Sequence, residues 1–306
     1  MRVKVGLIDV DGHNFPNLAQ MKLSAYYKAR GCLVEVASPQ GEYDVVYMSK
    51  VFDETYSPDL AWEPHADDII RGGTGYGLDN KLSYEVEHTY PDYELYPGLT
   101  ENTAFGFLTR GCPRGCDFCI VSEKEGRAAV KVADLDEFWR GQKFVKLLDA
   151  NILACKDAPE LLGQLVESKA YIDFTQGLDI RLMRDDYVQL ISRMKLKSIH
   201  FAWDDPRHDL TENFRDYAAK AKHKLHGDWG SVYALCNYST THDEDMWRIE
   251  TLVSLGYSPY VMIYGKPSAP KITRHLQRWC NAPPLRKSCT FAEYLKTKRY
   301  TGEEKQ

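Results

Sequence analysis

A regular alternation of strand-like and helix-like segments after Ala104 constrains the fold more than any other feature of the sequence. Between these segments, helical spacing recurs, as at Tyr187, Leu190, Ile191 and Met194. Repeated strand–helix units predict parallel strands with helices outside, here a partial (β/α)6 barrel of the α/β class. Ligands of such a fold bind at the carboxyl ends of the strands. The six expected strands are 104–109, 144–148, 171–175, 198–203, 231–235 and 260–264.

The amino-terminal part predicts a smaller domain. Residues 3–8 form an apolar strand pattern, 17–30 a helix, and 33–36 and 44–48 two more strands, which together predict a small Rossmann-like parallel α/β domain. Residues 52–103 show little periodicity. The run Gly72-Gly73-Thr74-Gly75 within them is followed by no helix, so we expect a flexible loop rather than a dinucleotide site. The predicted divisions are 1–98, 99–266 and 267–306.

The charge and hydropathy of the sequence limit the classes of partner that the protein is expected to bind. The chain carries 39 Lys and Arg against 44 Asp and Glu, so no global attraction to polyanions or anionic membranes is expected. The segment from Lys271 to Gln306 is basic, with nine Lys and Arg against three Asp and Glu. We interpret it as a solvated helical face, with an acidic partner or nucleic acid as the alternatives. Without a long apolar run or a signal-peptide pattern, we expect a cytoplasmic protein that does not engage membranes.

Three of the eight cysteines, Cys112, Cys116 and Cys119, lie within eight residues directly after the first strand of the repeated series. Three thiolates on one tight loop can hold three irons of a [4Fe–4S] cube and leave the fourth iron open. Structural zinc is the alternative, but it requires four ligands. The next cysteine, Cys155, is 36 residues further on with no histidine between. We therefore favour an iron–sulfur cluster.

This C-x3-C-x2-C loop at the end of the first strand resembles that of the radical S-adenosylmethionine (SAM) superfamily, and the resemblance covers 104–265. The amino-terminal domain resembles the cobalamin-binding-type domain of one branch. The resemblance implies that the open iron binds the amino and carboxylate groups of SAM. It also implies that one cluster electron splits SAM into methionine and a 5′-deoxyadenosyl radical. A reductant protein such as a flavodoxin or ferredoxin would supply that electron.

The resemblance assigns two further residues by position. Phe118, just before the third cysteine, matches the aromatic residue that packs near the adenine, although it also suits a plain hydrophobic anchor for the loop. Asp149 ends the second strand, where the family places an acceptor for the SAM amino group. A turn residue before Asn151 is the alternative for Asp149.

Polar residues also end the third and fourth strands of the series. Gln176, Asp179 and Arg181 follow the third strand, and we expect Arg181 to grip the SAM carboxylate while the other two orient ribose or substrate. A local Asp179–Arg181 pair is the alternative. Asp204 at the end of the fourth strand is a further candidate ligand.

The amino-terminal domain raises the question of cobalamin. Asp11-Gly12-His13 begins like the D-x-H-x-x-G loop that supplies an axial histidine to cobalt, but Pro16 stands where that pattern has glycine. A turn leading into a helix accounts for the same residues. We therefore favour a domain without cobalamin and expect His13 not to ligate cobalt.

The leading hypothesis is an enzyme that cleaves SAM reductively and abstracts hydrogen from an unknown substrate, which is a small molecule, an RNA or a peptide. One alternative is a cobalamin-dependent radical SAM methyltransferase. The other, suggested by the basic tail and the aromatic content, is a non-enzymatic metal-stabilised module that binds nucleic acid. The sequence names no residue as the catalytic acid, base or hydrogen donor.

Overall fold

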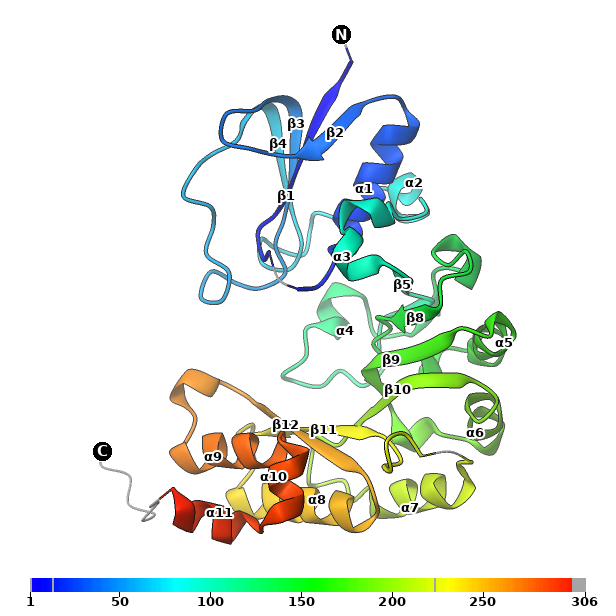
Figure 1. Ribbon diagram of the computed structural model, residues 1–306, viewed down its shortest axis with the longest axis vertical. Helices are drawn as coiled ribbons and strands as arrows, with labels where there is room; N and C mark the ends of the chain where they lie inside the picture. Colours follow the sequence, from blue (N-terminus) through cyan, green and yellow to red (C-terminus); the bar gives the residue numbers. More distant parts are fainter. Residues whose placement is uncertain (1, 13, 223, 299–306) are drawn as a thin grey trace. The chain divides into compact units, whose positions relative to one another are not determined.

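The computed structural model describes residues 2–12, 14–222 and 224–298 (Figure 1). Two compact units are present, and the chain passes between them more than once. The first unit contains Met1–Gly106 and Ala133–Val145, and the second contains Phe107–Val132 and Lys146–Gln306. No helix among the described residues combines the length and apolar character needed to cross a bilayer.

The first unit is built on a four-stranded parallel sheet in the order β2-β1-β3-β4. Helix α1 connects β1 to β2, and its amino-terminal cap is Asn17, whose side chain accepts a hydrogen bond from Gln20 N. On one face Val5 and Leu7 of β1 pack in a cluster with Leu23 of α1. The predicted Rossmann-like domain is confirmed. The elements of the first unit are β1 Lys4–Asp9, α1 Leu18–Ala29, β2 Leu33–Val36, β3 Glu42–Ser49, β4 His65–Gly72, α2 Tyr84–Glu87, η1 Tyr93–Leu95, α3 Pro97–Thr100 and η2 Leu135–Glu137, together with β5 Thr103–Gly106, which belongs to the second sheet.

Strand β4 lies in the stretch for which the sequence predicted no regular structure. Its residues are mostly half-exposed or exposed and include two aspartates, so they lack the apolar pattern of a buried strand. The glycines that follow pack around Lys50. Gly75 N donates to Lys50 O at 2.9 Å, and a Cβ on Gly73, whose φ is +92°, would lie 2.3 Å from the same oxygen. The glycine-rich run therefore admits the backbone of Lys50 and forms a hydrogen-bonded turn after β4, while its flexibility stays a prediction.

The second sheet has six strands in the order β12-β11-β10-β9-β8-β5, and β9 to β12 are joined by parallel pairing. Helices follow β8, β9, β10 and β11, which confirms the predicted α/β partial barrel. The expected first strand at 104–109 is divided, since β5 ends at Gly106 and Thr109 begins a short hairpin of β6 and β7. The remaining elements of this region are β6 Thr109–Arg110, α4 Val121–Lys124, β7 Val130–Lys131, β8 Phe144–Leu147, η3 Ile152–Ala154, α5 Ala158–Ser168, β9 Tyr171–Leu178, η4 Ile180–Leu182, α6 Asp185–Ile191, β10 Lys195–Ala202, α7 Thr211–Lys220, β11 Ser231–Cys236, α8 His242–Ser254 and β12 Ser258–Ile263.

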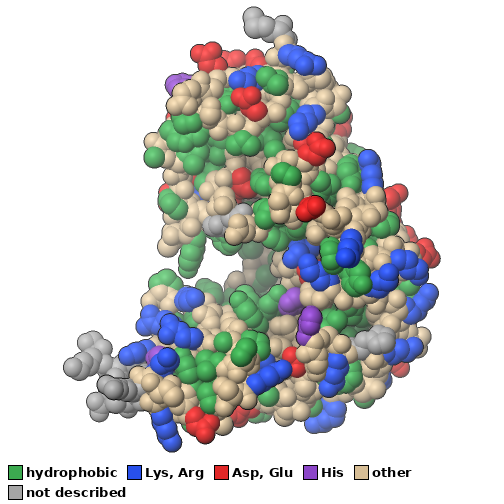
Figure 2. All heavy atoms as spheres, in the orientation of Figure 1, with side chains coloured by type: hydrophobic (Ala, Val, Ile, Leu, Met, Phe, Trp, Pro, Cys, Tyr) green, Lys and Arg blue, Asp and Glu red, His purple; other side chains and the backbone are tan. Residues whose placement is uncertain are grey.

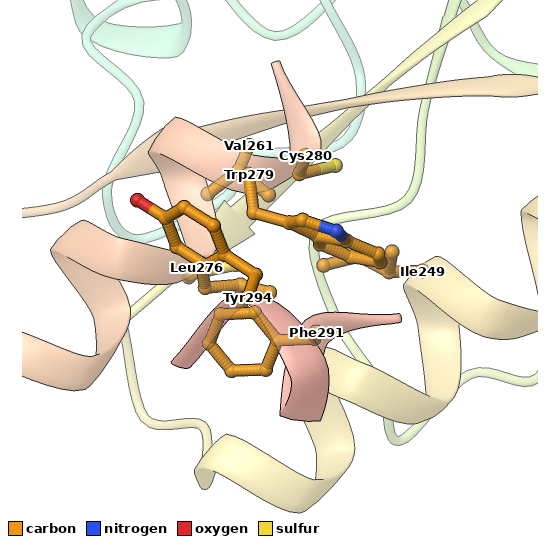
Figure 3. Packing of buried hydrophobic residues seen from close by; sticks show 8 residues of the cluster. Ile249, Val261, Leu276, Trp279, Cys280, Phe291 and Tyr294 are labelled. Atoms are coloured by element: carbon orange, nitrogen blue, oxygen red, sulfur yellow. The ribbon is translucent and has the colours of Figure 1, made fainter. Parts of the chain in front are cut away.

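The basic carboxyl-terminal segment folds onto the end of this sheet. After η5 Lys266–Ser268 it forms α9 Lys271–Cys280, α10 Pro283–Ser288 and α11 Phe291–Thr297. Trp279, Phe291 and Tyr294 pack with Val261 of β12 in a buried cluster (Figure 3). Lys and Arg side chains gather over these helices on the surface (Figure 2). Up to Lys298 the segment is therefore a packed part of the second unit with a charged outer surface.

Candidate functional site

The cysteine loop begins where β6 ends, and backbone contacts give it a defined course. Gly111 has a φ of +88°, and a Cβ there would lie 2.1 Å from Ala128 O, so only glycine allows the chain to pass. Cys112 N donates to Gly126 O at 3.2 Å, and Cys119 N donates to Cys116 O at 2.9 Å. The tight turn that three neighbouring thiolates require is thus formed by the backbone itself.

The three thiols of the loop are free and differ in exposure. Cys116 is exposed, whereas Cys112 and Cys119 are half-buried. Partial loss of hydration raises the pKa of Cys116, the charges of Cys119, Asp204 and Cys112 raise it further, and the charge of Arg181 opposes them. Asp204 and Arg181 therefore act electrostatically on the same thiol. No three or more His, Cys, Asp or Glu side chains of the described ranges are placed to hold one metal ion.

Asp149 anchors the strand that leads into the cysteine loop. Its carboxylate accepts hydrogen bonds from Leu108 N at 3.2 Å, from Thr109 N at 2.5 Å and from Thr109 Oγ1 at 2.7 Å. Burial raises the pKa of Asp149 to about 6, while these hydrogen bonds oppose the shift. The geometry gives Asp149 a structural role at the base of the loop. Its role as an acceptor for the SAM amino group stays a prediction.

Asn151, two residues beyond Asp149, contacts the loop directly and was not among the predicted site residues. Its side chain is buried, and Nδ2 donates to Cys112 Sγ at 3.6 Å. Its other amide atom, Oδ1, is buried without a hydrogen-bond partner. A buried acceptor with no partner is costly and marks a place where a ligand donor would fit. The sequence signal for Asn151 was its position just after a buried strand, a signal that Asp149 shares.

Asp179 and Arg181 form the local pair that the sequence offered as an alternative. Arg181 Nε donates to Asp179 Oδ1 at 2.7 Å, and Arg181 Nη2 donates to Asp179 Oδ2 at 3.2 Å. Arg114, in the cysteine loop between Cys112 and Cys116, makes an ion pair with the same carboxylate. Asp179 thus connects the cysteine loop to Arg181, an arrangement that spacing alone did not reveal.

The other predicted residues are placed differently. Asp204 Oδ1 accepts from Leu235 N at 3.0 Å, and burial raises the pKa of its carboxyl group. The ring of Phe118 packs edge-on against that of Tyr238, with 5.3 Å between the ring centres. Gln176 is exposed on β9. The charges of Arg181 and Asp204 act on Cys116, and Asp179 pairs with Arg114 of the cysteine loop, whereas no hydrogen bond or ion pair among the described residues joins Gln176 to that loop.

The residue types fit a [4Fe–4S] cluster bound by three cysteines, because each thiolate of such a cluster binds a different iron and the three need not converge on one metal ion. Thiolates are the protein ligands of such clusters, and N–H groups directed at the sulfurs are a usual part of their surroundings. Cys112, Cys116 and Cys119 supply the first, and Asn151 supplies the second at Cys112. The orphaned Oδ1 of Asn151 adds an acceptor for a ligand that carries N–H groups.

The chain thus combines a partial α/β barrel with a three-cysteine loop at the start of its strand–helix series. No family model matches the chain, and no characterised protein matches it significantly in sequence. Among solved structures it is similar to TsrM from Kitasatospora setae, a radical SAM methyltransferase with cobalamin and a [4Fe–4S] cluster bound. The TM-score is 0.60 at 10% identity, over 86% of this chain and 75% of that one. At this identity the likeness shows the fold.

Proposed function

We propose that this chain is a radical SAM enzyme. The observation that carries the proposal is the loop of Cys112, Cys116 and Cys119 directly after β6. The Asn151 amide donates a hydrogen bond to this loop at Cys112. The chain shares its fold with a radical SAM methyltransferase. A [4Fe–4S] cluster with SAM on its open iron would supply one-electron cleavage of the sulfonium to methionine and a 5′-deoxyadenosyl radical. A flavodoxin or ferredoxin is the expected reductant.

The chain's own residues have separate roles in this proposal. Asp149 fixes the strand before the loop, and Asn151 orients Cys112. Arg181 grips the SAM carboxylate through N–H donors that Asp179 aligns, because a paired guanidinium is held in one orientation. Phe118 and Asp204 complete the SAM site, with the aromatic ring beside the adenine and the carboxylate toward ribose or substrate. Gln176, which is exposed on β9, contacts the substrate.

The deciding experiment is an anaerobic incubation of the reconstituted protein with SAM and dithionite. We expect a brown protein with about four irons per chain and 5′-deoxyadenosine as the product. S-Adenosylhomocysteine would indicate methyl transfer instead. Cluster-loaded protein with SAM bound that never cleaves SAM would contradict the proposal. A colourless protein with stoichiometric zinc and salt-dependent binding of polynucleotides would favour the nucleic-acid-binding module.

A cobalamin-dependent methyltransferase is the second candidate, because the structurally similar TsrM was solved with cobalamin bound. In the first unit, the carboxyl end of the sheet is occupied by bonds within the chain. Tyr96 Oη donates to Asp9 Oδ2 at 2.9 Å, and Asn17 Nδ2 donates to Ser49 Oγ at 2.9 Å. His13 lies outside the described residues. We predict that protein incubated with hydroxocobalamin retains no stoichiometric corrinoid after desalting. A one-to-one corrinoid spectrum that His13→Ala alters would establish the second candidate.

Replacing Asn151 is predicted to lower the reduction potential of the cluster. A hydrogen bond to a cysteine sulfur favours the more negative, reduced form, so its loss disfavours reduction. In Asn151→Ala we expect a fall of roughly 20–60 mV, the equivalent of a hydrogen bond of about 0.5–1.5 kcal/mol for a one-electron couple. A redox titration monitored by electron paramagnetic resonance measures this change in reduction potential. Asn213→Ala on α7 is the matched control, and equal potentials in both variants would remove Asn151 from this role.

A further inference from the structure

A cavity of about 420 Å³ opens on the second unit beside the cysteine loop. Three segments line it: the loop through Pro113 and Arg114, the chain between β8 and α5 through Leu153 to Lys156, and the start of α6 with its preceding turn through Leu182 to Tyr187. None of the three cysteines lines it, nor do the other six predicted site residues. The cavity therefore adjoins the cysteine loop without including any of the predicted site residues.

The charged groups of the lining are all cationic. Arg114, Lys156 and Arg184 contribute to it, and no aspartate or glutamate does. Arg114 uses Nε to pair with Asp179, and Arg184 uses Nε and Nη2 to pair with Asp186. A guanidinium has five N–H donors, so both arginines keep donors that those carboxylates do not occupy. Lys156 makes no ion pair with any residue of the described chain. The lining therefore offers unused donors to an anion.

The rest of the lining is largely apolar. Leu153 and Leu182 contribute aliphatic surface, and the ring of Tyr187 lies beneath the guanidinium of Arg184, whose central carbon is 4.1 Å from the ring centre. This stacking covers one face of the guanidinium, and its Nη1 group, which Asp186 does not occupy, remains for a planar or tetrahedral oxyanion. A ligand for such a cavity has an anionic head and an apolar body.

We propose that this cavity binds a small organic oxyanion, a phosphate monoester or a carboxylate attached to an apolar group, with Lys156 and Arg184 as the main contacts to the charged head. The proposal does not depend on the proposed enzymatic function, because no cluster or SAM ligand lines the cavity. Arg114 belongs to both the cavity and the cysteine loop, so the bound anion would lie next to that loop.

The test is a calorimetric titration of the whole protein at constant ionic strength. The ligands are phenyl phosphate, phenylacetate, inorganic phosphate and the neutral phenylethanol. We expect saturable binding of phenyl phosphate or phenylacetate, tighter than that of inorganic phosphate and absent for phenylethanol. Whichever of the two organic anions binds with the higher affinity identifies the preferred head group, phosphate or carboxylate. Lys156→Gln is expected to weaken binding about tenfold to a hundredfold, through loss of a charge-assisted hydrogen bond.

Lys195→Gln is the matched control, because it removes the same charge from the start of β10, outside the lining. Arg184→Gln provides a second variant if Lys156→Gln does not fold, and circular dichroism checks the fold of each. Equal affinities in Lys156→Gln and Lys195→Gln would overturn the proposal. So would wild-type protein that binds neither organic anion at 10 mM, whether or not it carries a cluster.

Discussion

Alanine at Cys112, Cys116 or Cys119 is expected to abolish both cluster assembly and SAM cleavage. Each thiolate is assigned to a different iron, so the loss of one exposes a second iron and destabilises the cube. The surrounding loop cannot replace the missing ligand, because no other cysteine lies within it and the next in sequence, Cys155, is buried. Iron and sulfide analysis after anaerobic reconstitution measures the first effect, and formation of 5′-deoxyadenosine measures the second.

Cys32→Ala provides the control for these three variants. Cys32 belongs to the first unit, is half-buried and packs against the apolar cluster around Val5 and Leu7. Its loss is expected to leave iron content and turnover unchanged. A Cys116→Ala protein with a full complement of four irons and normal turnover would show that the loop does not bind the cluster as proposed.

The barrel strands were predictable because most of their buried positions carry apolar residues, as β11 does at Val232, Ala234 and Leu235. Residues 231–235 were expected as a strand, and β11 spans Ser231–Cys236. Strand β4 escaped prediction for the opposite physical reason. It lies at the edge of its sheet, pairs with β3 alone, and carries Asp67 and Asp68 where a buried strand would carry apolar residues. Pairing to a neighbour, which local sequence does not encode, makes this segment a strand.

The cysteine motif was recognisable because all its members lie within one short segment, whereas the contacts that hold it depend on tertiary structure. Asp149 was selected from sequence for its charge, but its oxygens bond to Leu108 and Thr109, about 40 residues earlier in the chain. Asn151 entered the sequence analysis only as the neighbour of a candidate turn residue, yet its amide reaches Cys112. Which of two neighbouring polar side chains faces the loop depends on how the chain leaves β8, and sequence spacing does not determine that path.

The ion pairs around Asp179 also include one contact that sequence spacing predicts and one that it does not. Its pairing with Arg181 was foreseeable from their separation of two residues. The contact with Arg114 joins positions 65 residues apart and requires the cysteine loop to approach the end of β9. Because of this contact, Asp179 links two segments that sequence analysis treated separately, and it pairs with Arg114, which lines the cavity beside the cysteine loop.

The largest effect on stability is expected at Arg248, which is fully buried in α8. Its guanidinium donates to Trp203 O at the end of β10, to Leu235 O in β11 at 2.9 Å, and to the buried carboxylate of Asp245. Arg248 thus holds the ends of two neighbouring strands, and Asp204, the next residue after Trp203, accepts from Leu235 N. The same residue that stabilises the sheet therefore also positions a candidate site residue.

Arg248→Ala is expected to lower the free energy of unfolding by about 3–5 kcal/mol, because it leaves the Asp245 carboxylate buried without its partner and two carbonyl groups without donors. Arg215→Ala is the control. Arg215 pairs with Glu212 on the exposed surface of α7, and such pairs contribute at most about 1 kcal/mol. Replacing both members, Arg248→Met with Asp245→Leu, should recover much of the loss because no unpaired charge remains. Urea denaturation of the four proteins measures these differences, and an Arg248→Ala loss no larger than that of Arg215→Ala would show that the buried pair does not stabilise the sheet.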